Sequence, residues 1–168
     1  MKAVQEEALF QISSEYDETA PQEEEVIESR KHLIFVTDNL KLGLDAEYVV
    51  EILNHHTVTY LPMMPDYIRG IFNMRGQIIP IMDIRQRLGK FPLEDGESLL
   101  VVLNYNETQI GILVDSVESM IDIPKDSIVP IPSRSAQKLV SGMCTLPDGS
   151  GTMLVLDCEQ LIARDYGM

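Results

Sequence analysis

The sequence contains no tryptophan and few basic residues. Lysine and arginine number 13 against 27 aspartates and glutamates, so the formal net charge is −14. Proteins that bind nucleic acid need a basic surface to neutralise phosphates, and single-strand binders add aromatic side chains on which bases stack. These two shortages argue against nucleic acid as a partner.

Cysteines and long apolar runs are also scarce. Cys144 and Cys158 are the two cysteines, and no C-x-x-C spacing occurs. This favours reduced, buried thiols in a cytosolic protein over a disulfide or a metal site. No run of about 18 apolar residues is present that would span a membrane, and the N-terminus lacks the basic start and apolar stretch of a secretory signal. We predict a cytoplasmic protein without direct insertion into a membrane.

Motifs for catalysis and cofactor binding are missing as well. There is no G-x-x-x-x-G-K-[ST] phosphate loop and no G-x-G-x-x-G after a strand. Gly149-Ser150-Gly151 lacks the spacing of a nucleophile elbow. His55 and His56 are adjacent, so on a strand they point to opposite faces and do not share one metal ion. The sequence predicts no enzyme, no cofactor and no metal.

The acidic residues are concentrated at the N-terminus. Residues 1–30 contain nine aspartates and glutamates but only Lys2 and Arg30 as bases, and they show no sustained periodicity. Such a segment buries too little apolar surface to fold. We therefore predict a disordered acidic tail over residues 1–30 and an ordered domain over residues 31–168.

From His32 onward, short apolar runs rich in β-branched residues alternate with turn residues. Many short strands at close spacing, with little room for long helices, are typical of an all-β barrel or sandwich. The predicted strands are His32–Thr37, Lys41–Leu44, Thr57–Leu61, Gly70–Met74, Gln77–Met82, Leu99–Tyr105, Thr108–Val114, Val117–Ile123, Val140–Thr145 and Thr152–Leu156.

One stretch fits two structures. Apolar residues at positions 46, 49, 50 and 53 have helical spacing, and Asp45 is a candidate N-cap. Val49, Val50 and Ile52 are β-branched, however, which favours a strand. A helix, and a helical turn that runs into a strand, both remain open.

An internal repeat links the two halves of the folded region. Gly70–Leu88 and Gly142–Leu161 each run through glycine, strand, turn, apolar strand, aspartate and short helix. The two aspartates, Asp83 and Asp157, are predicted helix N-caps rather than a catalytic carboxylate pair.

This repeat predicts two similar units. We expect an all-β fold of two five-stranded SH3/OB-like β-barrel subdomains with short helices. The units join within Lys90–Ser98, which gives approximate subdomains 31–90 and 91–168, and an exchange of strands between them remains open.

The most distinctive segment runs from Tyr67 to Arg85. Gly76 suits a turn position with positive φ, and Arg75 beside it is expected to project outward. Pro80 removes one donor from an otherwise apolar strand, so that strand is predicted to lie at an edge or to carry a bulge.

This segment resembles the hallmark of the CheW-like family. The family pattern R-G-h-h-N-L-R-G-x-h-h-P-h-h-D-L-R, where h is hydrophobic, matches Arg69 to Arg85, with Met74 and Ile84 replacing its two leucines. Two other family signatures have counterparts, so that the resemblance extends from Lys31 to Ala163. These counterparts are Gly43–Asp45 followed by Val49–Ile52, and Gly111–Val117.

The resemblance implies a pair of five-stranded β-barrels and a non-enzymatic chemotaxis adaptor. Such an adaptor bridges the regulatory domain of a chemotaxis histidine kinase and the cytoplasmic hairpin tip of chemoreceptors, and is recruited to membrane-associated receptor arrays. The implied partner-binding residues are Asn73, Met74, Arg75 and Gly76 for receptor coupling, and Val49, Glu51 and Ile52 in other signalling contacts. Arg75 and Glu51 are the strongest candidates, as exposed charges that set orientation and specificity.

Two other interpretations remain open. The same type of domain forms the regulatory end of the kinase, but the chain begins with Met1, lacks ATP-binding motifs and stops soon after the last predicted helix. We therefore expect a free-standing adaptor rather than an isolated kinase domain. A small-barrel binding module of another kind is the second alternative.

Overall fold

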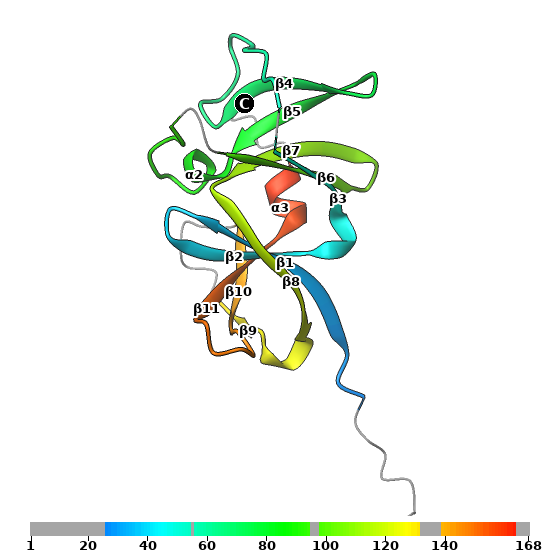
Figure 1. The fold of residues 1–168 in the computed structure, drawn as a ribbon, viewed down its shortest axis with the longest axis vertical. Helices are drawn as coiled ribbons and strands as arrows, with labels where there is room; N and C mark the ends of the chain where they lie inside the picture. The colour runs from blue at the N-terminus through cyan, green and yellow to red at the C-terminus, as the bar shows by residue number, and fades with distance from the viewer. Residues whose placement is uncertain (1–25, 55, 95–97, 132–138, 164–168) are drawn as a thin grey trace, which may run out of the picture.

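Two β-sheets form most of the part of the chain that the structure describes (Figure 1). The computed structural model describes residues 26–54, 56–94, 98–131 and 139–163. The predicted all-β class and the two β subdomains are confirmed. Within the described strands no ladder joins the two edges of either sheet, so the ladders do not close the predicted barrels.

The first sheet, called sheet A, has six strands in the order β8-β1-β2-β11-β10-β9. It has one strand more than predicted because the two-residue β9 pairs with β10. Its strands are β1 (Ser29–Thr37), β2 (Leu40–Asp45), β8 (Ser116–Pro124), β9 (Val129–Pro130), β10 (Val140–Thr145) and β11 (Thr152–Leu156).

The second sheet, sheet B, has five strands in the order β3-β6-β7-β5-β4. Its strands are β3 (Val49–Leu53), β4 (Ile68–Met74), β5 (Gln77–Asp83), β6 (Leu99–Tyr105) and β7 (Thr108–Val114). The sheets interleave along the chain, because β1 and β2 join the C-terminal strands. The boundary predicted near residue 90 therefore lies between two segments of sheet B.

Among the described residues, three short helices lie between strands and a fourth, α3, follows the last strand. Asp83 accepts a hydrogen bond from the N–H of Arg85 at 2.9 Å, and Asp157 accepts one from Gln160 at 3.2 Å, so both aspartates are N-caps as predicted. The helices are η1 (Ala46–Tyr48), α2 (Ile84–Arg87), η2 (Lys125–Ser127) and α3 (Cys158–Ile162).

The stretch after Asp45 adopts the second of the two predicted alternatives. One turn of 3-10 helix, η1, runs directly into β3. Asp45 caps this turn by accepting from the N–H of Glu47 at 3.0 Å. The β-branched residues after it favour extended backbone and end the helix after one turn.

The strand predicted over Thr57–Leu61 is wrong. Thr59 forms only an isolated bridge to Ile71, with N–O distances of 2.8 and 2.9 Å. The register of β4 shifts between Ile68 and Gly70, and this bulge breaks the line of partners beyond the bridge.

The first described strand begins close to the predicted boundary, and both cysteines have the predicted state. β1 begins at Ser29, two residues before the predicted start of the domain, and residues 1–25 of the predicted tail lie outside the described residues. Cys144 and Cys158 are free, buried thiols, as expected. Burial raises the pKa of Cys158 to about 12.

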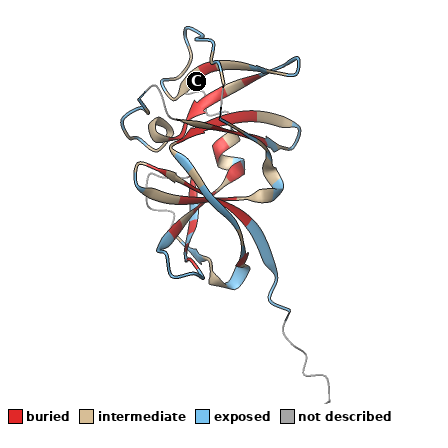
Figure 2. Ribbon diagram, in the orientation of Figure 1, coloured by how far each residue is buried: buried red, intermediate tan, exposed pale blue. Residues whose placement is uncertain are grey.

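One apolar cluster lies between the two sheets (Figure 2). It combines Phe35 and Leu42 of sheet A with Leu103 and Ile112 of sheet B, and with Leu161 of α3. Because both sheets bury side chains in this shared cluster, they pack as one body. Each sheet also has a smaller cluster of its own.

Candidate functional site

The tight turn between β4 and β5 fixes the first candidate surface. Arg75 and Gly76 both have positive φ, 52° and 87°, which is the geometry of a two-residue type I′ turn. The Asn73 Oδ1 accepts a hydrogen bond from the N–H of Gly76 at 3.0 Å. The positive φ predicted for Gly76 is therefore confirmed, and the turn is held by the side chain that precedes it.

Arg75 and Glu51 meet on the surface. The Arg75 Nη2 lies 3.4 Å from the Glu51 carboxylate, and the arginine side chain is 80% exposed against 30% for the glutamate. Glu51 belongs to β3, and β3 and β4 are the two edge strands of sheet B. The pair thus joins the β4–β5 turn to the opposite edge of a strongly curled sheet. An ion pair this exposed adds little stability, so both charges remain available to a partner.

The other predicted site residues divide between surface and interior. Ile52 is exposed on β3 together with Val50. Val49 packs against the cluster shared by the two sheets, and Met74 packs against the smaller cluster of sheet B. The structure therefore brings Glu51, Ile52 and the 73–76 turn to one end of sheet B, while Val49 and Met74 serve mainly in packing.

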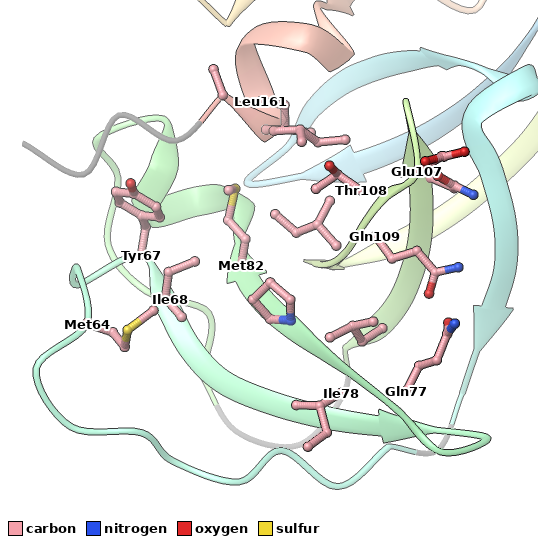
Figure 3. Close-up of a pocket in the computed structure, with 16 residues that line it drawn as sticks. Met64, Tyr67, Ile68, Gln77, Ile78, Met82, Glu107, Thr108, Gln109 and Leu161 are labelled. Atoms are coloured by element: carbon pink, nitrogen blue, oxygen red, sulfur yellow. The ribbon is translucent and has the colours of Figure 1, made fainter.

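A groove of about 640 Å³ opens between β5 and β7, next to α3 (Figure 3). Its apolar lining comes from β5, from the start of β7, from α3 and from the segment that leads into β4. Ile78 of β5 is 66% exposed. The apolar residues that line the groove include Met64, Tyr67, Ile78, Pro80, Met82, Ile110, Leu161 and Ile162.

The Pro80 strand was predicted to lie at an edge or to carry a bulge. The edge is wrong for the strand as a whole, because β5 lies inside sheet B, between β7 and β4. A bulge is present in the β4–β5 ladder, but its extra residue belongs to β4, between Ile68 and Gly70. The described register of β5 with β7 covers only Ile81–Asp83, however, so residues 77–80 pair with β4 alone. Pro80 is tolerated because it sits where the strand has a single partner.

A second apolar surface lies at the far edge of sheet A. This surface was not predicted from the sequence. Val129 of β9 and Met143 of β10 are register partners and are 58% and 40% exposed. In Figure 1 this edge lies at the opposite end of the molecule from the β4–β5 hairpin. Alternation in β10 was readable from the sequence, but the two-residue β9 is too short for a periodicity to identify.

The remaining charges of the hallmark segment are part of the fold. Arg69 donates to the buried Asp83 at 2.9 Å. Arg85 binds Asp115 through two nitrogens, and Asp115 holds the pKa of the Arg85 guanidinium above its ordinary value. These contacts tie α2 to β5 and to the β7–β8 junction. They are structural.

A further ion pair ties the two sheets together. The Lys90 Nζ lies 2.8 Å from Asp38 in the β1–β2 turn, and this contact lowers the pKa of the Asp38 carboxyl. The Asp38 N–H also donates to Asp115 at 3.1 Å. The turn of sheet A is thereby fixed against the end of sheet B.

The described residues form neither a metal-binding cluster nor a membrane-spanning helix. No group of three or more His, Cys, Asp and Glu among them is placed to hold a metal ion. None of the helices they form has the length and apolar character needed to cross a membrane. Of the paired histidines, His55 lies outside the described residues.

Comparison with known proteins gives the family. Residues 31–165 match the CheW-like domain. The chain therefore belongs to the CheW-like family, as the hallmark segment indicated. Family membership accounts for the two β subdomains, which are also present in a solved relative.

Three relatives illustrate the match. The chemotaxis protein CheW of Klebsiella aerogenes is 30% identical over 140 residues, which cover 81% of this chain and 83% of that protein. The CheW of Treponema pallidum is 29% identical over 132 residues, covering 72% and 75% of the two chains. The crystal structure of the scaffolding protein TtCheW from Thermoanaerobacter tengcongensis superposes with a TM-score of 0.71 at 27% identity, covering 77% of this chain and 90% of that one. The chain is thus similar to chemotaxis scaffolds.

Proposed function

We propose that this protein is a non-enzymatic chemotaxis adaptor that couples chemoreceptors to the chemotaxis histidine kinase. An adaptor needs two binding surfaces that do not overlap. The observation that carries the proposal is the pair of exposed surfaces at opposite ends of the molecule, one on sheet B and one on the edge of sheet A.

The sheet B end is the proposed receptor side. It combines the Arg75–Glu51 pair with the groove between β5 and β7, so charge and apolar surface lie on the same sheet. A receptor hairpin tip consists of helices, and an apolar helix ridge fits a groove of this kind. The charged pair would fix orientation and rate of encounter, and the groove would supply the buried apolar area.

The edge of sheet A is the proposed kinase side. Val129 and Met143 form a small exposed apolar pair at β9, which is the edge strand among the described strands of sheet A. Such an edge accepts a strand or a loop of a neighbouring β-domain, and the kinase's regulatory domain is expected to be of this type. Binding at both ends would recruit the protein to membrane-associated receptor arrays from the cytoplasm.

The test is a pulldown with a receptor cytoplasmic hairpin fragment and, separately, with a kinase regulatory domain. Wild-type protein is expected to bind both. Arg75→Ala and Glu51→Ala are expected to weaken receptor capture about tenfold while leaving the fold intact, and Lys31→Ala serves as a matched change of an exposed charge elsewhere. A folded wild-type protein that captures neither cognate partner would overturn the proposal.

A further inference from the structure

The parallel ladder between β5 and β7 stops before either strand does. Its described register starts at Ile81 opposite Gly111, although β5 begins at Gln77 and β7 at Thr108. The residues that precede Ile81 in β5 and Gly111 in β7 line the groove instead of pairing (Figure 3). The groove therefore exists because the ladder ends.

Pro80 supplies the reason. Gln77 flanks the two-residue turn and bonds to β4, so the backbone groups of Ile78 and Pro80 are directed toward β7. One more step of the parallel ladder would need the N–H of residue 80 to donate to the carbonyl of Gln109. Proline has no N–H. The same proline still fits opposite Ile71 in β4, where no donor is required.

Gln109 carries a buried acceptor that lacks a donor. Its Oε1 is buried without a hydrogen-bond partner, and its backbone carbonyl is the group that the N–H of a residue other than proline at position 80 would have served. Gln109 is one of the residues that line the groove. A buried acceptor without a donor is costly, so a ligand that brings a donor gains affinity.

The charge of the groove selects the kind of donor. Glu107 is the one charged residue among the described residues that line it, and no basic residue is among them. Glu107 lies in the turn just before β7, two positions from Gln109. A carboxylate and an amide acceptor that line the same groove favour a basic side chain, above all the multiple donors of an arginine.

We propose that Pro80 is a positioning residue that ends the β5–β7 ladder and keeps the groove open, and that Gln109 and Glu107 then bind a basic side chain flanked by apolar residues on the docking partner. The part that concerns the partner rests on the proposed function. The part that concerns Pro80 is a property of the free protein.

The first experiment replaces Pro80 with leucine and measures amide hydrogen exchange by NMR on the full chain without any partner. The new N–H at position 80 is expected to exchange at least about tenfold more slowly than an unprotected amide, because it can bond to Gln109. Exchange as fast as in an exposed loop would overturn the role of Pro80. Pro92→Leu, a proline outside the ladders, is the control.

Wild-type protein gives an independent reading if the variant folds poorly. The amide of Ile78, directed into the groove, is expected to exchange fast, and that of Ile79, directed toward β4, slowly. Equal protection of the two amides would contradict the open edge.

The second experiment measures affinity for a receptor hairpin fragment. Gln109→Leu is expected to weaken binding about 5- to 20-fold while raising the thermal midpoint, since it removes an unsatisfied buried acceptor. Gln109→Glu retains acceptors and is expected to bind at least as tightly as wild type, with stronger salt dependence. Gln160→Leu on α3 is the control.

The outcomes separate the two claims. Affinity of Gln109→Leu within twofold of wild type would overturn the basic-donor site. Absence of binding by wild type would contradict the proposed receptor partner, and with it the partner half of this inference, while the exchange result at position 80 would still decide the role of Pro80.

Discussion

Each sheet contains one pair of parallel strands, and the two ladders begin at different distances from the capping aspartates of the repeat. β11 pairs with β2 from Leu154 opposite Leu42 and continues with Val155 opposite Gly43. β5 pairs with β7 over three residues, from Ile81 opposite Gly111 to Asp83 opposite Leu113. Counted back from the capping aspartates of the repeat, Leu154 is the counterpart of Pro80. The ladder includes this position where it is leucine and begins one residue later where it is proline.

Both parallel ladders contain a glycine that side chains cover, Gly43 in β2 and Gly111 in β7. A Cβ added to Gly43 would lie 2.2 Å from the Met153 Sδ, and one added to Gly111 would lie 2.6 Å from the Ile81 Cδ1. Both positions therefore require glycine for the same reason, which is side-chain packing over the strand. Since glycine is required in both ladders, we attribute their different starting points to the residue at position 80 or 154.

The largest difference between the repeats is expected at the capping aspartates. Asp83 is fully buried and accepts hydrogen bonds from Arg69, from the N–H of Leu93 and from the N–H of Arg85, each at 2.9 Å. Asp83→Ala is expected to cost about 3 kcal/mol, because it removes a fully buried carboxylate that accepts from an arginine and from two amides, and leaves those amides without this acceptor. Urea unfolding measures this.

The matched change in the other repeat is Asp157→Ala. Asp157 caps α3 through one described side-chain bond, to Gln160. The loss expected from this cap is about 1 kcal/mol. Equal destabilisation by the two substitutions would contradict the distinction drawn between a buried hub and a simple cap.

Leu154→Pro is expected to have the next largest effect. It brings the residue of β5 into β11 and removes a ladder donor toward β2, at a cost of about 2 kcal/mol. The amides of β2 near Gly43 are expected to lose hydrogen-exchange protection. Unchanged protection would show that the leucine is not what extends this ladder.

Arg75→Ala is expected to have the smallest effect on stability. Its ion pair with Glu51 is long and mostly solvated, so the free energy of unfolding should change by no more than about 0.5 kcal/mol. Thermal denaturation tests this. A larger loss would mean that Arg75 holds sheet B together rather than meeting a partner.

The sequence predicted the strands, the caps and the turn well because each depends on neighbouring residues. The cap at Asp83, the turn at Gly76 and the apolar run of β10 are each set over a few positions. The exchange of β1 and β2 into sheet A depends on distant partners, which a local pattern does not contain. The isolated bridge at Thr59 depends on a bulge in β4 and was missed for the same reason.

The candidate site was predictable only in part. Arg75 was identified by its turn, and its partner Glu51 by resemblance, but their contact across the two edges of sheet B required the fold. Pro80 was recognised as a missing donor, whereas the groove that results depends on β7. The exposed pair Val129 and Met143 had no local signal in β9.

The most direct test of the adaptor account is sequential binding on a biosensor. A receptor hairpin fragment is immobilised and saturated with this protein, and a kinase regulatory domain is then added. The account predicts a second, additive signal that Val129→Asp abolishes without affecting the first step. Displacement of the protein from the receptor by the kinase domain would mean that one surface serves both partners, and would contradict the account.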